Sequence, residues 1–364
     1  MTVADEHEEQ ADVEAMSPIG LSKNRYPTGW FQVGWSADLA PGEVRPIHYF
    51  GRELVLWRSE EGVTSVADAY CLHLGAHLGH GGRVHGEVLA CPWHGWRWDL
   101  EGRNTHIPYS SQECKKNLRL EMWPTMEHYG CILVWHDITC GPPTWTPALV
   151  PELEGDSHYP LDPTRNHSWV IKAHPQMLME NGVDAFHIPF IHGAGEPPSI
   201  QGVEVDGHRW TTHLTVPYGA GKESTWLTPD GAIQASMRFD LEGVGMGIAV
   251  WPELLMDGRM ITNPTPVDEE HTEVFWCMTV ARQEGHDEPH RGALKMMEHQ
   301  KAVVEMDFVI FANMKVGHIP NFAPEEAQHY AHMRRWAWQF YPGSGALLEG
   351  IRSARSNGDG GAAG

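Results

Sequence analysis

The chain has 364 residues, of which 41% are hydrophobic and 10% aromatic, so it is long enough for two folded domains with sizeable cores. Its 48 acidic residues against 26 Lys and Arg give a formal net charge of −22, which argues against nucleic acid or an anionic membrane as the main partner. No apolar run of about 18 residues and no signal peptide is found, so we expect no integral membrane segment and a cytoplasmic protein.

Composition and turn residues divide the chain into five segments. Residues 1–24 are acidic with few large apolar side chains, and residues 346–364 are mostly small, so both ends are predicted to be disordered. Short apolar runs broken by turns indicate an all-β domain over residues 25–140. A connector over residues 141–155 carries four prolines, which disfavour helix and sheet, and a second domain over residues 156–345 follows.

The second domain mixes helices and strands. A helix is predicted from Gln176 to His187, and a long helix from about Gly292 to Lys315. Between them lie four apolar, strand-like runs, "HRWTTHLTVPYG", "AIQASMRFDLEG", "GMGIAVWPE" and "TEVFWCMTVAR". We therefore predict an α+β domain with an antiparallel sheet curled around the long C-terminal helix.

Cysteine and histidine occur in two close pairs, Cys71-x-His73 and Cys91-x-x-His94. The six cysteines of the chain are too sparse for a disulfide scaffold, which favours a metal site. Thiolate and imidazole bind both zinc and iron, but a Cys-x-His pair is tight for structural zinc. A binuclear iron cluster with two thiolates on one iron and two imidazoles on the other needs one Cys and one His from each of two loops.

The two pairs, with Gly79, Gly81 and Gly82 between them, resemble a Rieske [2Fe-2S] domain. This resemblance implies that Cys71, His73, Cys91 and His94 bind the cluster. His77, His80 and His85 are interpreted as loop histidines. Imidazole ligands raise the cluster's potential above that of an all-cysteine cluster, which suits a role in accepting electrons and passing them on.

The segment "MENGVDAFHIPFIHG" contains His187 and His192, which an uninterrupted helix would place on different faces. Pro189 is expected to break the helix after His187 and let His192 turn back toward it. Two imidazoles and one carboxylate form the facial triad of non-haem Fe(II) oxygenases. Asp307 is a candidate carboxylate, because its neighbours on the long helix are apolar and an unpaired buried carboxylate is costly: Val303, Val304, Ile310 and Phe311. Asp184 is the alternative, since it lies within one turn of His187.

The pattern Asn181-x2-Asp184-x2-His187-x4-His192, with Asp307 downstream, resembles the catalytic domain of the Rieske non-haem iron oxygenases. The resemblance implies a helix-grip (START-like) fold and a mononuclear Fe2+ bound by His187, His192 and Asp307. It also implies that Asp184 links this iron to the cluster ligand His94 of a neighbouring subunit, in a head-to-tail homotrimer. Asn181 belongs to the same motif and is predicted to act with Asp184.

Flanking segments such as "DAYCLHLGAHLGHGG", "CPWHGWRWDLEGRNTHIPY" and "MRRWAWQFY" are most similar to the oxygenase component of 3-ketosteroid 9α-hydroxylase and to the cholesterol 7-desaturase group. The resemblance implies O2 as co-substrate and hydroxylation of a steroid or similar hydrophobic molecule. It implies a ferredoxin or a flavin/iron–sulfur reductase as electron donor, and no G-x-G-x-x-G fingerprint follows a strand here. Seven apolar residues are candidates for the pocket wall: Met177, Met237, Met246, Trp251, Phe275, Trp276 and Met278.

Two other functions are compatible with the sequence. One is a Rieske oxygenase that hydroxylates, demethylates or desaturates a smaller aromatic or other natural product, because the sequence around the iron ligands departs from the steroid-type pattern. The other is a non-enzymatic electron carrier or a zinc-binding interaction module that uses residues 25–140 alone.

Overall fold

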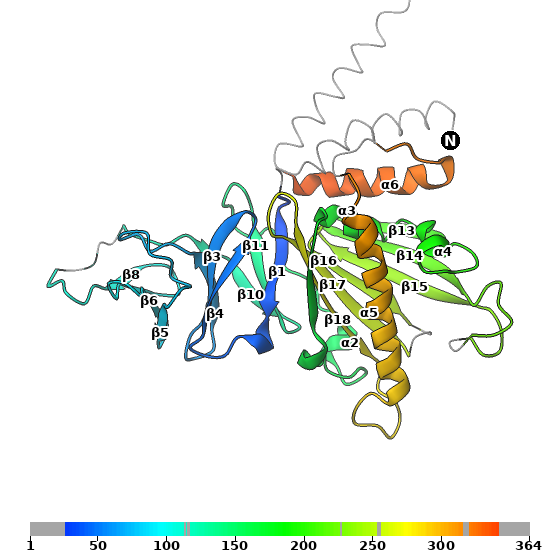
Figure 1. Ribbon diagram of the computed structural model, residues 1–364, viewed down its shortest axis with the longest axis horizontal. Helices are drawn as coiled ribbons and strands as arrows, with labels where there is room; N and C mark the ends of the chain where they lie inside the picture. Colours follow the sequence, from blue (N-terminus) through cyan, green and yellow to red (C-terminus); the bar gives the residue numbers. More distant parts are fainter. Residues whose placement is uncertain are drawn as a thin grey trace, which may run out of the picture.

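The computed structural model describes residues 26–112, 114, 117–225, 228–252, 256–315 and 320–341. The ends predicted to be disordered, residues 1–24 and 346–364, lie outside these ranges. An N-terminal part built of β-strands lies at one end of the molecule, and a larger part with a wide sheet and helices lies at the other (Figure 1). This is the predicted order of an all-β domain followed by an α+β domain.

Three antiparallel sheets make up the N-terminal part, in the strand orders β1-β11-β10, β2-β3-β4-β9 and β5-β6-β7-β8. A single turn of 3-10 helix, η1 (Ser36–Asp38), follows the first strand. The strands are β1 (Gly29–Trp35), β2 (Val44–Tyr49), β3 (Arg52–Arg58), β4 (Thr64–Asp68), β5 (Arg83–His85), β6 (Val88–Ala90), β7 (Arg97–Trp98), β8 (Asn104–His106), β9 (Met122–Trp123), β10 (Thr125–His128) and β11 (Cys131–His136).

The β2–β3 hairpin connects the two parts of the molecule. Its two turn residues, Phe50 and Gly51, have φ values of 56° and 66°, which is the conformation of a tight hairpin turn and is unusual for a bulky residue such as Phe50. The backbone N–H groups of Phe50 and Gly51 donate to the carbonyls of Pro266 and Val267, each at 2.9 Å. These contacts to the large sheet hold the turn in place.

The large sheet has seven antiparallel strands in the order β12-β18-β17-β16-β15-β14-β13. Strands β13 to β18 are neighbours in chain order, and β12 pairs with β18 at one edge of the sheet. The first and last strands of the domain therefore lie side by side. All four strand-like runs of the sequence are strands here, and β12, β13 and β17 were not predicted. The strands are β12 (His167–Ile171), β13 (Ser199–Asp206), β14 (Arg209–Tyr218), β15 (Ile233–Glu242), β16 (Met246–Trp251), β17 (Gly258–Pro266) and β18 (Thr272–Val280).

Helix α5 (Arg291–Phe311) lies in front of the sheet in Figure 1, and α6 (Pro324–Ala337) lies across its upper end. The predicted fold class, an antiparallel sheet with a long C-terminal helix, is confirmed, although α5 ends four residues before Lys315 and α6 was not predicted. The remaining helical segments are short: α2 (Pro151–Glu154), η2 (Pro163–Arg165), α3 (Pro175–Glu180), α4 (His187–Ile191) and η3 (Trp338–Phe340).

Three predictions about prolines and helices were wrong. The connector does contain one helical turn, α2, because Pro151 occupies its first position, where the missing N–H is not needed. The predicted helix 176–187 is two helices, α3 and α4, separated by residues 181–186. Pro189 does not end a helix: it lies in the first turn of α4, which begins at His187.

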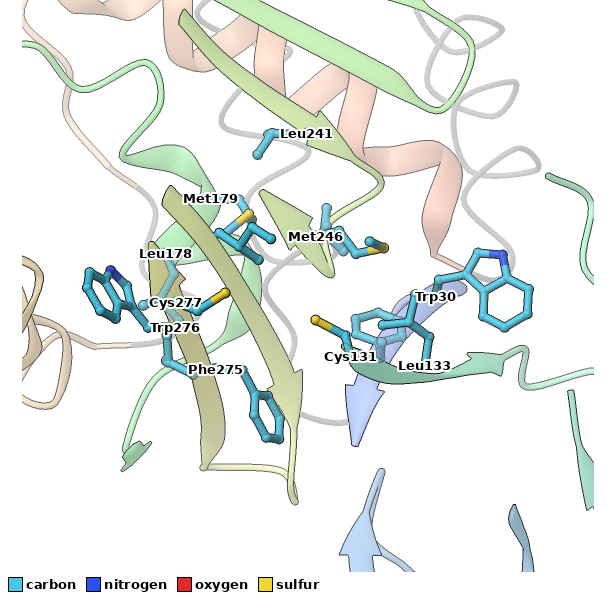
Figure 2. Packing of buried hydrophobic residues seen from close by; sticks show 14 of the residues in the cluster. Trp30, Cys131, Leu133, Leu178, Met179, Leu241, Met246, Phe275, Trp276 and Cys277 are labelled. Carbon is cyan, nitrogen blue, oxygen red and sulfur yellow. The ribbon is translucent and has the colours of Figure 1, made fainter. Parts of the chain in front are cut away.

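A continuous hydrophobic core joins the two parts. Figure 2 shows Cys131 and Leu133 of β11 on one side, and Phe275, Trp276 and Cys277 of β18 on the other, within one cluster of buried side chains. Polar bonds cross the same boundary, since Asn263 Nδ2 donates to Gln32 Oε1 at 2.9 Å and Thr265 donates to the Gln32 carbonyl at 2.6 Å. The N-terminal part therefore contacts the large sheet through both apolar packing and hydrogen bonds. A second, smaller core lies under its outer loops.

Candidate functional site

Two loops with the same backbone pattern hold the predicted cluster residues. The loop between β4 and β5 carries Cys71 and His73, and the loop between β6 and β7 carries Cys91 and His94. In each loop the cysteine N–H donates to the carbonyl five residues later, at 2.9 and 2.8 Å. The cysteine carbonyl in turn accepts from a glycine N–H four residues later, at 2.9 and 3.0 Å, and both glycines have positive φ. The irregular Cys/His spacing thus corresponds to two equivalent turns.

The two loops bring like residues together. Cys71 and Cys91 are buried, and their side chains form a hydrogen bond. The ring centroids of His73 and His94 are 4.6 Å apart, and the His73 ring stacks on Trp96 at 4.6 Å. Two thiols therefore lie beside each other and two imidazoles beside each other. This is the donor arrangement of a cluster in which one iron takes two thiolates and the other takes two imidazoles.

The protonation state of these residues also fits a bound cluster. Burial and the adjacent Cys91 raise the pKa of the Cys71 thiol to about 11, so thiolates there need a compensating cation. The Nδ1 atom of His73 is buried without a hydrogen-bond partner within the described residues. A buried imidazole nitrogen with no partner is costly unless it binds a metal.

A second group of metal-binding side chains lies between α3, α4 and α5. One ligand atom from each of His187, His192 and Asp307 lies within 4.8 Å of the other two. Asp307 Oδ1 lies 3.2 Å from His192 Nε2. The Nδ1 atom of His192 is buried without a hydrogen-bond partner within the described ranges, and His187 Nδ1 has the Asp184 carboxylate beside it at 3.5 Å. These residues fit the mononuclear iron.

The local fold explains why these two histidines converge. His187 is the first residue of α4 and His192 is its C-cap, so one short helix presents both imidazoles, with ring centroids 5.3 Å apart. Asn181, directly after α3, donates from Nδ2 to Asp307 Oδ2 at 3.1 Å and orients the carboxylate. Asp307 therefore faces the site, where Asn181 and His192 contact its two carboxylate oxygens. It does not point into the apolar core, although its neighbours on the helix are apolar.

Asp184 is adjacent to this group but outside it. Its Oδ1 accepts from the N–H groups of Phe186 and His187, both at 3.2 Å, and this caps the start of α4. Its Oδ2 lies 3.5 Å from His187 Nδ1, and Tyr330 of α6 donates a hydrogen bond to the same carboxylate. Burial acts against the shift, but the hydrogen bond and charge of His187 lower the pKa of Asp184. The geometry favours Asp307 over Asp184 as the carboxylate ligand.

A cavity of about 450 Å³ opens beside the three-residue group. Its walls come from α3, α4, strands β14 to β17 and α5, and most of them are apolar. Of the seven predicted wall residues, only Met237 and Trp251 line this cavity. The other five do not: Met246 lines a different cavity, and Met177, Phe275, Trp276 and Met278 are buried in the core.

Sequence reasoning missed several polar residues near the site, among them Gln300, Thr262 and Tyr330. Gln300 and Thr262 line the cavity, and Tyr330 binds Asp184. Gln300 precedes Asp307 by seven residues, a spacing that places both on one face of a helix and was available as a signal. No local pattern pointed to Tyr330, which lies on a helix that was not predicted.

Family models match two long segments of the chain. Residues 29–125 match the Rieske [2Fe-2S] domain, which defines the chain as a Rieske protein. Residues 134–341, more than half of the chain, match the 3-ketosteroid 9alpha-hydroxylase C-terminal domain. The chain therefore belongs to the Rieske non-haem iron oxygenases of the 3-ketosteroid 9α-hydroxylase family, with a [2Fe-2S] cluster and a mononuclear iron as cofactors. A carrier or zinc module made of residues 25–140 alone does not account for the matched catalytic domain.

Individual relatives come from two groups. The chain is 35% identical to a cholesterol 7-desaturase of Xenopus laevis over 338 residues, 87% of this chain and 72% of that protein. It is 28% identical to a 3-ketosteroid-9-alpha-monooxygenase oxygenase component of Rhodococcus rhodochrous over 350 residues, 92% and 88% of the two chains. The matches to cholesterol 7-desaturases of Hemicentrotus pulcherrimus and Bombyx mori span only 36% and 42% of those proteins.

Solved structures agree in fold. The crystal structure of dicamba monooxygenase bound to dicamba superposes with a TM-score of 0.66 at 16% identity, covering 90% of this chain and 98% of that one. No helix among the described residues is long and apolar enough to cross a membrane.

Proposed function

We propose that this protein is the terminal oxygenase of a multicomponent monooxygenase that uses O2 to hydroxylate a steroid or a similar polycyclic, hydrophobic molecule. One observation carries the proposal: a largely apolar cavity of about 450 Å³ has His187, His192 and Asp307 in its wall. Cavities of this size and character hold rigid apolar ligands. Both groups of relatives are named for steroid or sterol substrates.

In this proposal Cys71, His73, Cys91 and His94 hold the [2Fe-2S] cluster, and His187, His192 and Asp307 hold the Fe2+. When bound, the two groups supply one-electron transfer and activation of O2. Asn181 keeps the Asp307 carboxylate oriented through its 3.1 Å hydrogen bond. The apolar walls would exclude water from the bound substrate.

The accessibility of Asp184 supports a role in passing electrons between subunits. The capping bonds hold its carboxylate next to His187, and its side chain is 23% exposed, so an incoming group can reach it. We assign it the link to His94 of a neighbouring chain. Asp184→Asn should then leave both metals bound while turnover collapses, and near-normal turnover of the fully loaded variant would refute this role.

Exposed apolar residues at both sites support a head-to-tail homotrimer. Leu72, Leu74 and Trp93 are exposed on the two cluster loops, and Phe186 and Phe190 are exposed beside the iron site. Contact between copies would cover both patches and bring each cluster to its neighbour's iron.

The electron donor is a ferredoxin or a flavin/iron–sulfur reductase, and we place the protein in the cytoplasm. We further assign residues 25–140 to the Rieske domain, 141–155 to the connector and 156–345 to the catalytic domain.

The test is a single turnover of the loaded, chemically reduced protein with 18O2 against one steroid panel and one aromatic panel. The proposal predicts a steroid alcohol that carries one 18O atom and no product from the aromatic panel. Product from aromatic compounds alone would overturn the substrate class. Desaturation is a second candidate, favoured by the 35% identity to a cholesterol 7-desaturase, and it would give an alkene without 18O.

A further inference from the structure

We infer that Gln300 forms a polar subsite that binds a ketone or hydroxyl oxygen of the substrate, so that the cavity selects oxygenated polycycles over bare hydrocarbons. The inference deepens the proposed function and rests on it. Its starting point is α5, where Gln300, Val304, Asp307 and Phe311 line the cavity as one stripe. In a stripe of apolar residues around the iron ligand, a carboxamide is the exception.

Gln300 is buried, and its amide lacks a protein partner in the described part of the chain. The residue is only 9% exposed, and no hydrogen bond of its side chain is found within those residues. The other two buried glutamines of the described chain are satisfied. Gln32 binds Asn263 and the Gly34 carbonyl, and Gln176 binds Glu180 and Tyr341. A buried amide that faces a cavity without protein partners is stabilised when the cavity's ligand supplies them.

Two other polar side chains of the cavity wall are not open to a ligand. Thr262 lies on β17, on the face that presents Met260 to the cavity, but its Oγ1 is itself buried. The hydroxyl of Tyr218 already accepts from Trp251 at 3.0 Å. Gln300 is therefore the side chain that offers a donor and an acceptor to a ligand.

The spacing on α5 sets how such a ligand lies. Gln300 is two helical turns before Asp307, about 10 Å along the axis. A rigid fused-ring molecule whose reacting carbon lies at the iron can therefore place an oxygen at its other end against the amide. A glutamine amide both donates and accepts, so it can bind a ketone or a hydroxyl. The ligand class is a polycyclic hydrocarbon skeleton with one terminal oxygen function.

The test measures binding, independently of turnover, by calorimetric titration of the iron-loaded protein with 5α-androstan-3-one and 5α-androstane, which differ only in the ketone. The native protein should bind the ketone at least tenfold more tightly. Gln300→Leu should weaken ketone binding by about tenfold to a hundredfold and leave binding of the hydrocarbon unchanged or stronger. Gln300→Met, which keeps the length of the side chain, should also weaken only the ketone, and it serves if Gln300→Leu does not fold.

Two controls separate this effect from a general loss. Val304→Ala removes apolar wall and should weaken both ligands equally, whereas Gln234→Leu on the exposed face of β15 should change neither. Equal affinity of the native protein for both ligands, or equal weakening of both by Gln300→Leu and Gln300→Met, would overturn the subsite while the steroid proposal stands. Binding of neither steroid by the native protein would overturn the steroid proposal and the subsite with it.

Discussion

A buried ion pair is expected to hold α6 against the iron-bearing segment, and Glu180→Gln tests it. Arg334 of α6 donates from Nε and Nη2 to the two carboxylate oxygens of Glu180, at 2.8 and 2.7 Å. The two side chains are only 6% and 8% exposed. Gln176 donates to the same carboxylate at 2.9 Å. Glu180 directly precedes Asn181, so the pair connects α6 to the residue that orients Asp307.

The magnitude follows from the burial of the pair. Removing one partner of a buried, hydrogen-bonded ion pair leaves an uncompensated charge and costs about 3–5 kcal/mol. If α6 undocks as a unit, its opening free energy falls by that amount. At about 1.4 kcal/mol per factor of ten, this corresponds to amide exchange roughly 100- to 4000-fold faster across residues 324–337.

Hydrogen exchange followed by mass spectrometry measures this directly, with the same substitution at Glu298 as the control. Glu298 pairs with Lys301 on α5 at 3.1 Å, but its side chain is 67% exposed. An exposed pair is worth about 0–1 kcal/mol, so Glu298→Gln should change exchange in α5 by less than about fivefold. Equal, small effects of the two substitutions would refute the reasoning.

Three further predictions concern single side chains. Tyr330→Phe removes a hydrogen bond to the Asp184 carboxylate and should lower kcat by about tenfold or more with unchanged KM and iron content; a KM change alone would contradict a positioning role. Burial lowers the pKa of His136 in the folded protein to about 4, whereas in the unfolded chain it is about 6.5. As the pH falls through this range, the unfolded chain takes up a proton on His136 and the folded protein does not. The free energy of unfolding is therefore highest above about pH 6.5 and decreases toward pH 4. The urea midpoint between pH 7 and 5 should therefore fall more for the native protein than for His136→Phe, by the equivalent of about 2 kcal/mol. A Cβ on Gly182 would lie 2.1 Å from Phe239 Cδ1 in the cavity wall, so Gly182→Ala should weaken steroid binding, measured by titration, while both metals stay bound.

The cluster loops could be predicted from sequence because their information is local. Cys71 with His73, and Cys91 with His94, lie within single turns, and the resemblance to a Rieske domain rests on that spacing. Asp307 could be named as a candidate ligand although it lies far from the two histidines in the sequence. The reason is that an acidic residue with apolar neighbours on a helix needs a compensating partner. The family model that matches residues 29–125 confirms the resemblance to a Rieske domain.

Errors arose where tertiary contacts override local preference. Asp184 caps α4 with two backbone hydrogen bonds, and this moved the helix break ahead of His187 rather than after it. Strand β17 was missed because it contains Pro264 and Pro266, which are uncommon in central strands. Both lie beyond Thr262, where β16 no longer pairs with β17, so no ladder bond is lost on that side. Five of the seven cavity residues were predicted wrongly. An apolar side chain on a strand can face either the cavity or the core, and the sequence pattern is the same in both cases.

Metal and sulfide analysis of the purified protein, together with EPR of its reduced state, tests the central claim of two separate iron sites most directly. The native protein should contain about three iron atoms and two sulfides per chain and give a Rieske-type signal. Asp307→Ala should lose about one iron atom and keep the signal and both sulfides. A colourless protein that contains only zinc, or an Asp307→Ala variant with the full native iron content, would contradict the account.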